Sequence, residues 1–111
     1  MQLAARNVRS YYRTMSALLF DTNALIKLCR ENDVAKLGVF GSIARGEGND
    51  ESDVDLLVEF SKRKSLLALV TLERKMSAVL GRKVDLLTEA AISPYLRDGI
   101  KRDLRIIYET R

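Results

Sequence analysis

Residues 53–60 read DVDLLVEF and alternate between apolar and polar side chains so regularly that they fix one element of the fold. Successive side chains of a β-strand point to opposite faces of a sheet. The residues that would share the face packed on a core are Val54, Leu56, Val58 and Phe60. The residues on the opposite face are Asp53, Asp55, Leu57 and Glu59. The sequence therefore predicts a strand with two aspartates side by side, directed away from the core.

The remaining elements follow from apolar runs and from apolar residues at helical spacing. The predicted strands cover residues 36–40, 53–60 and 83–88, and the predicted helices cover residues 15–30, 66–80 and 95–102. Residues 104–108 fit either a strand or a helical turn. The residues of helix 66–80 expected to face the core are Leu66, Leu69, Val70, Met76, Val79 and Leu80, and Gly81 is the expected C-terminal cap. Strands that alternate with helices around one sheet are typical of the α/β or α+β class.

The chain has 111 residues, which is enough for one domain, and 47% of them are hydrophobic and 31% charged, as in ordinary globular proteins. Residues 1–14 are basic and polar and precede a second methionine, Met15. This segment fits either a frayed helical turn or an extension upstream of a start at Met15. We therefore expect an N-terminal extension at 1–14 and a single domain at 15–111.

Histidine is absent and cysteine occurs once, which excludes several kinds of catalytic and metal site. The chain contains no histidine, so imidazole serves neither as a catalytic base nor as a metal ligand. Cys29 is the only cysteine, which excludes an internal disulfide and a cysteine-based zinc site. We expect it to be a small core residue of helix 15–30. Because no apolar run is long enough for a membrane span and no signal peptide is evident, we expect a cytoplasmic protein.

Acidic residues on the predicted sheet are the first candidates for chemistry. Asp53 and Asp55 project side by side and repel each other, and a bound Mg²⁺ or Mn²⁺ ion removes that cost. Two ordinary aspartates on a solvent-facing strand are the simpler interpretation of this short pattern alone. Asp85 lies in KVDLLT and joins the same face if strand 83–88 neighbours strand 53–60. Three converging carboxylates are what a two-metal phosphoryl-transfer site requires.

A Gly-Ser pair lies between the predicted strand 36–40 and a helical turn. Gly41 permits the backbone to approach a phosphate closely, and the hydroxyl of Ser42 can hold phosphate oxygens together with N–H groups at a helix start. Arg45 adds guanidinium donors for the same anion. Alone, the pair is an ordinary turn, but its place ahead of the acidic strand favours phosphate binding.

Read together, GSIARGEGNDESDVDLLVEF resembles the signature of the DNA polymerase β-like nucleotidyltransferase superfamily. In that pattern a Gly-Ser turn precedes a strand bearing Asp-x-Asp, and a third acidic residue follows on a later strand. More narrowly, GSIARGE, SDVDLLVEF and GRKVDLLT are similar to the minimal nucleotidyltransferases that are partners of HEPN-domain proteins. The resemblance covers residues 34–108 and implies the nucleotidyltransferase fold, a small mixed β-sheet with helices packed mainly on one face.

The resemblance also implies roles for individual residues. The implied nucleotide-binding residues are Gly41, Ser42, Arg45 and Gly46, and the implied catalytic and metal-binding residues are Asp53, Asp55 and Asp85. Gly41 and Ser42 would hold the triphosphate, with Arg45 supporting the triphosphate loop or the active site. Asp53 and Asp55 would bind two Mg²⁺ or Mn²⁺ ions. Asp85 would complete one metal site and help to deprotonate the attacking hydroxyl.

Related minimal nucleotidyltransferases are antitoxins that transfer AMP from ATP to a tyrosine of a HEPN ribonuclease. The resemblance therefore implies an adenylyltransferase that releases pyrophosphate and forms a hetero-oligomer with a HEPN toxin, with no membrane partner and no direct nucleic-acid binding. A non-catalytic module that inhibits the toxin by occlusion is the alternative from another class. An antibiotic-modifying nucleotidyltransferase is disfavoured because there is no acceptor-binding domain. A basic nucleic-acid-binding protein has only the net charge of +4 in its favour.

Two groups of residues remain open to two interpretations each. Residues 62–64 (KRK) are either a solvated loop or a contact for phosphates or an acidic partner. The C-terminal apolar residues are either core or interface, and they are Tyr95, Leu96, Ile100, Ile106, Ile107 and Tyr108.

Overall fold

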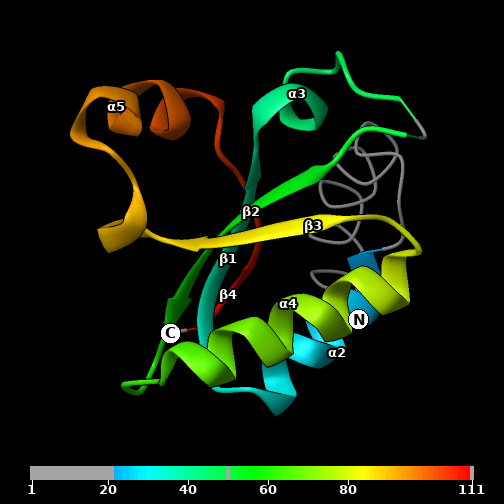
Figure 1. The fold of residues 1–111 in the computed structure, drawn as a ribbon, viewed down its shortest axis with the longest axis vertical. Helices are drawn as coiled ribbons and strands as arrows, with labels where there is room; N and C mark the ends of the chain where they lie inside the picture. The colour runs from blue at the N-terminus through cyan, green and yellow to red at the C-terminus, as the bar shows by residue number, and fades with distance from the viewer. Residues whose placement is uncertain (1–21, 50, 111) are drawn as a thin grey trace, which may run out of the picture.

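The computed structural model describes residues 22–49 and 51–110, which form a sheet with helices on one face and at one end (Figure 1). The elements in chain order are α2 (Thr22–Glu31), β1 (Val34–Phe40), α3 (Gly41–Ala44), β2 (Val54–Phe60), α4 (Leu66–Leu80), β3 (Val84–Thr88), the 3₁₀ helix η1 (Glu89–Ala91), α5 (Pro94–Asp103) and β4 (Arg105–Glu109). The expected extension at 1–14 and the first part of helix 15–30 lie outside the described residues. No described helix has both the length and the apolar character needed to cross a membrane.

The four strands form one mixed sheet in the order β3-β2-β1-β4. β1 is antiparallel to both β2 and β4, whereas β2 and β3 are parallel and are connected through α4. This confirms the expected class, a small mixed sheet with helices mainly on one face. In the segment 104–108, for which two structures were possible, residues 105–108 belong to the edge strand β4, and Leu104 is the C-cap of α5.

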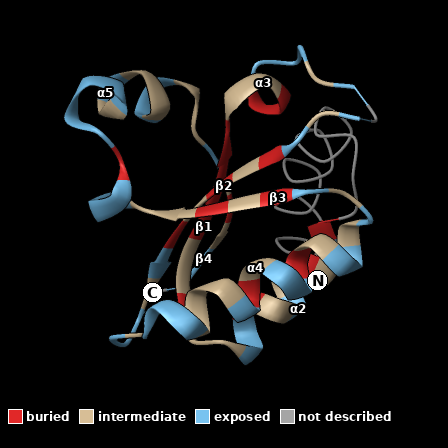
Figure 2. Ribbon diagram, in the orientation of Figure 1, coloured by how far each residue is buried: buried red, intermediate tan, exposed pale blue. Residues whose placement is uncertain are grey.

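The core lies between the sheet and the helices α2 and α4 (Figure 2). Val54, Leu56 and Val58 of β2 are buried, as the alternation of the sequence predicts. Cys29 of α2 is fully buried, and burial raises the pKa of its thiol to about 12. It is therefore a neutral core residue at physiological pH, which confirms the prediction.

α4 begins and ends at the predicted residues, but its buried face is narrower than predicted. Leu72 and Met76 are buried, whereas Leu66 is 75% exposed and Val79 is 48% exposed. The expectation that Leu66 and Val79 face the core was wrong. Leu66 lies in the first turn of the helix, and Val79 lies beside the stripe of residues that packs on the core. Gly81 is the C-terminal cap, with a left-handed backbone and an N–H that donates to the carbonyl of Ser77.

The KRK segment at 62–64 lies next to the turn that precedes β1. The ammonium of Lys64 lies 2.6 Å from one carboxylate oxygen of Asp33, and that of Lys62 lies 3.7 Å from the other. The hydrogen bond from Lys64 is the main cause that lowers the pKa of Asp33. Two of the three cations in this segment thus have an internal partner, which favours a structural loop over a phosphate contact.

The apolar residues of the C-terminal region divide between core and surface. Ile107 of β4 is buried. Tyr95 and Leu96 lie in the first turn of α5 and are 96% and 62% exposed. The buried residue belongs to the sheet, whereas the exposed pair forms a small apolar surface at the start of α5.

Candidate active site

The face of the sheet opposite α2 and α4 carries the predicted aspartates. Asp53 directly precedes β2 and Asp55 lies within it, so their side chains share this face. β3 is the parallel neighbour of β2, and Asp85 lies opposite Asp55 in their register. The strand that carries Asp85 is thus the neighbour of the strand that carries Asp55, and Asp85 joins the acidic face.

Asp55 is the electrostatic centre of this group. Burial is the main cause that raises the pKa of its carboxyl, and the negative charges of Asp85 and Asp53 raise it further. A hydrogen bond to the Asp85 side chain acts in the same direction, while the positive charge of Arg45 acts weakly against it. Two facing carboxyl groups thus share a half-buried position in which a proton or a cation relieves their repulsion.

Asp53 lies at the edge of this arrangement. Its side chain is half exposed, and one carboxylate oxygen lies 3.9 Å from the ammonium of Lys83. Among the described residues, no three acidic or cysteine side chains stand close enough together to hold a metal ion in their present positions. The structure therefore brings Asp55 and Asp85 together and leaves Asp53 beside them, directed toward Lys83.

Gly41 connects the end of β1 to this acidic pair. Phe40 lies opposite Asp55 in the antiparallel pairing of β1 with β2, so the chain leaves β1 beside the Asp55 carboxylate. The backbone of Gly41 has a φ of +75°, and a Cβ atom built on it would overlap Oδ2 of Asp55. The close approach and the left-handed backbone both require glycine here.

α3 is the single helical turn that follows, and it begins with Gly41 and Ser42. The N–H of Glu47 donates to the carbonyl of Ser42 at 2.9 Å and closes the turn. Ser42 is half-buried, next to the glycine that touches Asp55. Gly46 follows the turn with a φ of +76°, so the chain also needs glycine at the exit.

Arg45 holds this turn against α5. Its Nε lies 3.0 Å from the Glu47 carboxylate and its Nη1 lies 3.1 Å from Oδ2 of Asp103. These two partners, Asp103 first, raise the pKa of the guanidinium. Arg105 adds a hydrogen bond of 2.7 Å to the carbonyl of Ala44. The donors of Arg45 thus point to carboxylates of the protein, an arrangement that supports the loop from outside.

Sequence reasoning missed Arg82, which organises the loop before Asp53. Its Nη2 donates to the carbonyls of Asn49 and Ser52 at 2.5 Å. The loop is also closed internally, because the N–H of Asn49 donates to the hydroxyl of Ser52 at 2.9 Å. Arg82 directly follows the glycine cap of α4, and no spacing in the sequence distinguishes it from an ordinary surface arginine.

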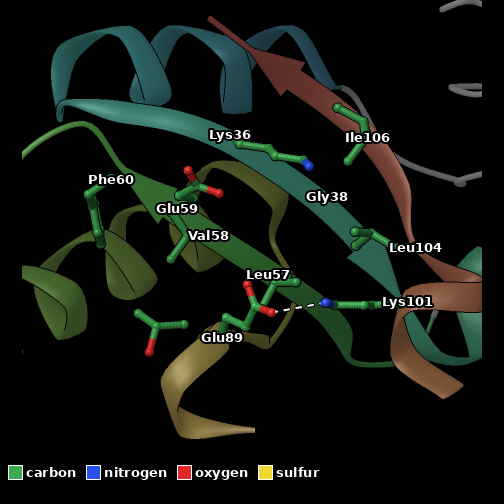
Figure 3. A pocket seen from close by; sticks show the side chains of 11 residues that line it. Lys36, Gly38, Leu57, Val58, Glu59, Phe60, Glu89, Lys101, Leu104 and Ile106 are labelled. Carbon is green, nitrogen blue, oxygen red and sulfur yellow. Dashed lines mark ion pairs between the residues drawn. The ribbon is translucent and has the colours of Figure 1, made fainter. Parts of the chain in front are cut away.

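Sequence reasoning also missed a hollow of about 350 Å³ on the acidic face (Figure 3). The residues that line it come from all four strands, β3 contributing only its last residue, and from the segments around α5 and η1. They are Lys36, Gly38, Leu57, Val58, Glu59, Phe60, Thr88, Glu89, Lys101, Leu104 and Ile106. Leu57 and Glu59 continue the line of Asp53 and Asp55 along β2, so the hollow adjoins the carboxylates.

Comparison with known proteins finds relatives that are named protein adenylyltransferases. A candidate protein adenylyltransferase of Methanocaldococcus jannaschii is 45% identical over 76 residues, which cover 68% of this chain and 82% of the relative. The protein adenylyltransferase MntA of Thermococcus cleftensis is 39% identical over 71 residues, which cover 64% of this chain and 72% of the relative.

Solved structures share the fold. One chain of a toxin–antitoxin complex with AMP-PNP matches with a TM-score of 0.71 and 26% identity, over 82% of this chain and 75% of that one. A candidate minimal nucleotidyltransferase matches with a TM-score of 0.62 and 32% identity, over 90% and 92% of the two chains. The model of the nucleotidyltransferase domain matches residues 23–107. The resemblance found in the motifs is therefore confirmed, and the chain belongs to the nucleotidyltransferase domain family.

Proposed function

We propose that this protein transfers AMP from ATP to a hydroxyl group, most naturally a tyrosine, of a HEPN-type toxin and thereby acts as its antitoxin. The observation that carries the proposal is the contact between the Gly41 backbone and the Asp55 carboxylate, with Asp85 directly opposite Asp55. This contact joins a phosphate-binding type of turn to a pair of facing carboxylates. Phosphoryl-transfer sites combine these two parts.

The acidic face suits two Mg²⁺ or Mn²⁺ ions. Burial and the neighbouring charges raise the pKa of Asp55, and a bound cation would offset both effects. Its oxygen donors are the hard ligands that these ions prefer. Asp55 and Asp85 would hold the ions, and Asp53 would join them by turning from Lys83, with which its contact of 3.9 Å is long and exposed. When bound, the ions would neutralise the triphosphate and lower the pKa of the acceptor hydroxyl.

The other residues of the site would hold the nucleotide, support α3 and accept the proton of the acceptor hydroxyl. Gly41 and Ser42 would hold the β- and γ-phosphates beside the acidic pair, where the absence of a side chain on Gly41 lets the Asp55 carboxylate approach the turn. Arg45 would keep α3 in place through Asp103 rather than contact the nucleotide. Asp85 would accept the proton of the attacking hydroxyl. Positioning and charge stabilisation would supply most of the acceleration.

The comparisons support the donor and the partner by similarity. Relatives that cover about two thirds of the chain are named protein adenylyltransferases, and a structural neighbour is a toxin–antitoxin complex with AMP-PNP. The exposed pair Tyr95 and Leu96 at the start of α5 offers an apolar surface for a partner. The same surface supports the second candidate function, inhibition of the toxin by occlusion without catalysis.

The test is label transfer from α-labelled ATP to the protein encoded beside this chain, in the presence of Mg²⁺. We expect an increase in the intact mass of the partner by whole AMP units, and a loss of at least 100-fold in rate in Asp55→Asn. Glu31→Gln is the matched control, because it removes one exposed carboxylate from α2 on the opposite face of the sheet.

Two outcomes would contradict the proposal. Equal transfer by Asp55→Asn and by the wild type would remove the carboxylates from the mechanism. A tight complex that silences the partner with no label on any protein would favour occlusion.

A further inference from the structure

The hollow lies in line with α3 and the acidic pair. Along β1 the order is Lys36 and Gly38 at the hollow, then Phe40 opposite Asp55, then Gly41 at the start of α3. Along β2, Leu57 is opposite Gly38 and follows Asp55 by two residues. At a rise of about 3.3 Å per residue, the floor of the hollow begins about 7 Å from Asp55. The acidic pair therefore lies between α3 and the hollow.

Gly38 lets Leu104 come close to β1 at the edge of the hollow. A Cβ atom on Gly38 would come within 2.5 Å of Cδ1 of Leu104 and 3.3 Å of the carbonyl oxygen of Arg105. Without that atom, Leu104 packs close to β1 and forms a wall beside the bare backbone of Gly38 (Figure 3). Gly38 and Leu104 therefore line the hollow together.

The lining combines an apolar floor with a charged rim. Leu57, Leu104 and Ile106 supply aliphatic surface. At the rim, the ammonium of Lys101 on α5 lies 3.1 Å from the carboxylate of Glu89 in η1, and this ion pair spans one side of the opening (Figure 3). An apolar floor with a few polar groups at the edge suits a flat ring that has one polar end.

We infer that this hollow holds the ring of the acceptor, a phenolic side chain whose hydroxyl points toward Asp55 and Asp85. The inference rests on the proposed function, because it places the second substrate of the same reaction. In an in-line displacement the leaving group and the nucleophile lie on opposite sides of the phosphorus. With the triphosphate held at α3, pyrophosphate leaves on the α3 side, and the attacking oxygen arrives from the side of the hollow.

The reaction at this position is the transfer of AMP to the phenolic oxygen. The phenolic oxygen forms a bond to the α-phosphorus, and the bond from that phosphorus to the bridging oxygen breaks. Pyrophosphate leaves with the electron pair, and the phenolic proton passes to the carboxylate of Asp85. A volume of about 350 Å³ has room for a phenolic ring together with its hydroxyl.

The test fills the hollow with Leu57→Trp and uses Leu66→Trp as the matched control. Leu66 is 75% exposed at the start of α4, so the control makes the same substitution away from the open face. We expect Leu57→Trp to lower kcat/KM for the protein acceptor at least tenfold, while the Kd for ATP with Mg²⁺ stays within twofold of the wild type. Leu66→Trp should match the wild type in both quantities.

A second measurement does not depend on catalysis. N-acetyltyrosinamide is added to the chain, and the methyl signals of Leu57, Leu104 and Ile106 are followed by NMR, with N-acetylserinamide as the control ligand. We expect the three methyl signals to shift with the tyrosine compound alone, and the shifts at Leu104 and Ile106 to disappear in Leu57→Trp.

The outcomes separate this inference from the proposed function. Methyl shifts without any AMP transfer by the wild type would support the phenol site and reject the adenylyltransferase. Transfer by the wild type with unshifted methyl signals would overturn the inference alone. A Leu57→Trp variant that binds ATP tenfold more weakly would also overturn it, because the hollow would then hold the nucleoside.

Discussion

The α-carbon of Gly41 lies so close to Asp55 that a methyl group on it would overlap the Asp55 carboxylate. The two residues come from the end of β1 and from the adjacent strand β2, and the antiparallel register brings them together. The turn expected to hold phosphates and the carboxylate expected to hold a metal ion thus form one unit. A change at either residue acts on both.

Gly41→Ala should therefore impair both the fold and the site. The left-handed backbone at this position costs about 1–2 kcal/mol with a side chain present, and the clash with Asp55 adds to that cost. Gly81→Ala is the matched control, because Gly81 has a φ of +63° but open space around it. Chemical denaturation should show a larger loss of unfolding free energy for Gly41→Ala, and only this variant should lose AMP transfer. Equal losses in both variants would mean that the contact with Asp55 has no energetic consequence.

Mg²⁺ should stabilise the wild type through the acidic pair. A ligand that binds only the folded state raises its stability by about 2.7 kcal/mol at 100 times its Kd. We expect a rise in Tm on adding Mg²⁺ with a nonhydrolysable ATP analogue, and a much smaller rise in Asp55→Asn. Without Mg²⁺, Asp55→Asn should be at least as stable as the wild type at neutral pH, because the repulsion with Asp85 is gone. A variant that is clearly less stable without Mg²⁺ would contradict the account of the pKa of Asp55.

Cys29 gives a prediction on pH. Its folded pKa of about 12 lies above the ordinary value of 9.0, so the buried thiol contributes stability below pH 9 that is lost as the pH rises from 9 toward 12. In Cys29→Ala, the unfolding free energy should fall less over this range than in the wild type. The thiol should also react with a disulfide reagent at pH 8 only in proportion to the unfolded fraction. Fast labelling of the native protein without denaturant would contradict the burial of Cys29.

The sequence predicted the parts of the fold that depend on local pattern. The alternation of apolar and polar residues predicted β2. Apolar residues at helical spacing, together with Gly81, predicted both ends of α4. The open-face position of Asp85 depended on which strand lies beside β2, a long-range pairing that no single segment encodes. The exposure of Leu66 depended on where the helix meets its neighbours, which spacing alone does not give.

The hollow was beyond prediction for a related reason. Its lining joins Gly38 of β1 to residues more than sixty positions away, such as Leu104. Arg82 was missed because its partners are carbonyl oxygens of a loop, and these leave no mark in the residue pattern. Motif reasoning found the acidic residues, the Gly-Ser turn and Arg45, and it missed Arg82, which holds the loop before Asp53.

Arg45 and Asp103 should behave as one unit that supports α3. The pair is partly exposed, so its removal should lower the unfolding free energy only slightly. Arg45→Ala and Asp103→Ala should each lower kcat, and the double variant should be no worse than the poorer single variant. Glu47→Ala is the control for the second, more exposed contact of Arg45 and should have a smaller effect. If Asp103→Ala bound ATP more tightly than the wild type, the freed Arg45 would be a direct phosphate ligand instead.

Arg82 should control the loop that delivers Asp53 to the acidic face. One guanidinium nitrogen donates to the carbonyls of both Asn49 and Ser52, and hydrogen bonds from a charged group contribute about 1.5–3 kcal/mol. Arg82→Ala should lower the unfolding free energy by an amount in this range, and Arg82→Lys should recover part of it because one donor group remains. Asp53 directly follows Ser52, so Arg82→Ala should also raise the Mg²⁺ concentration needed for half-maximal transfer. Arg74 is exposed on α4, so Arg74→Ala serves as the control. It should change neither the unfolding free energy nor the Mg²⁺ dependence. If Arg82→Ala lost stability but kept the wild-type Mg²⁺ dependence, the loop would support the fold without positioning Asp53.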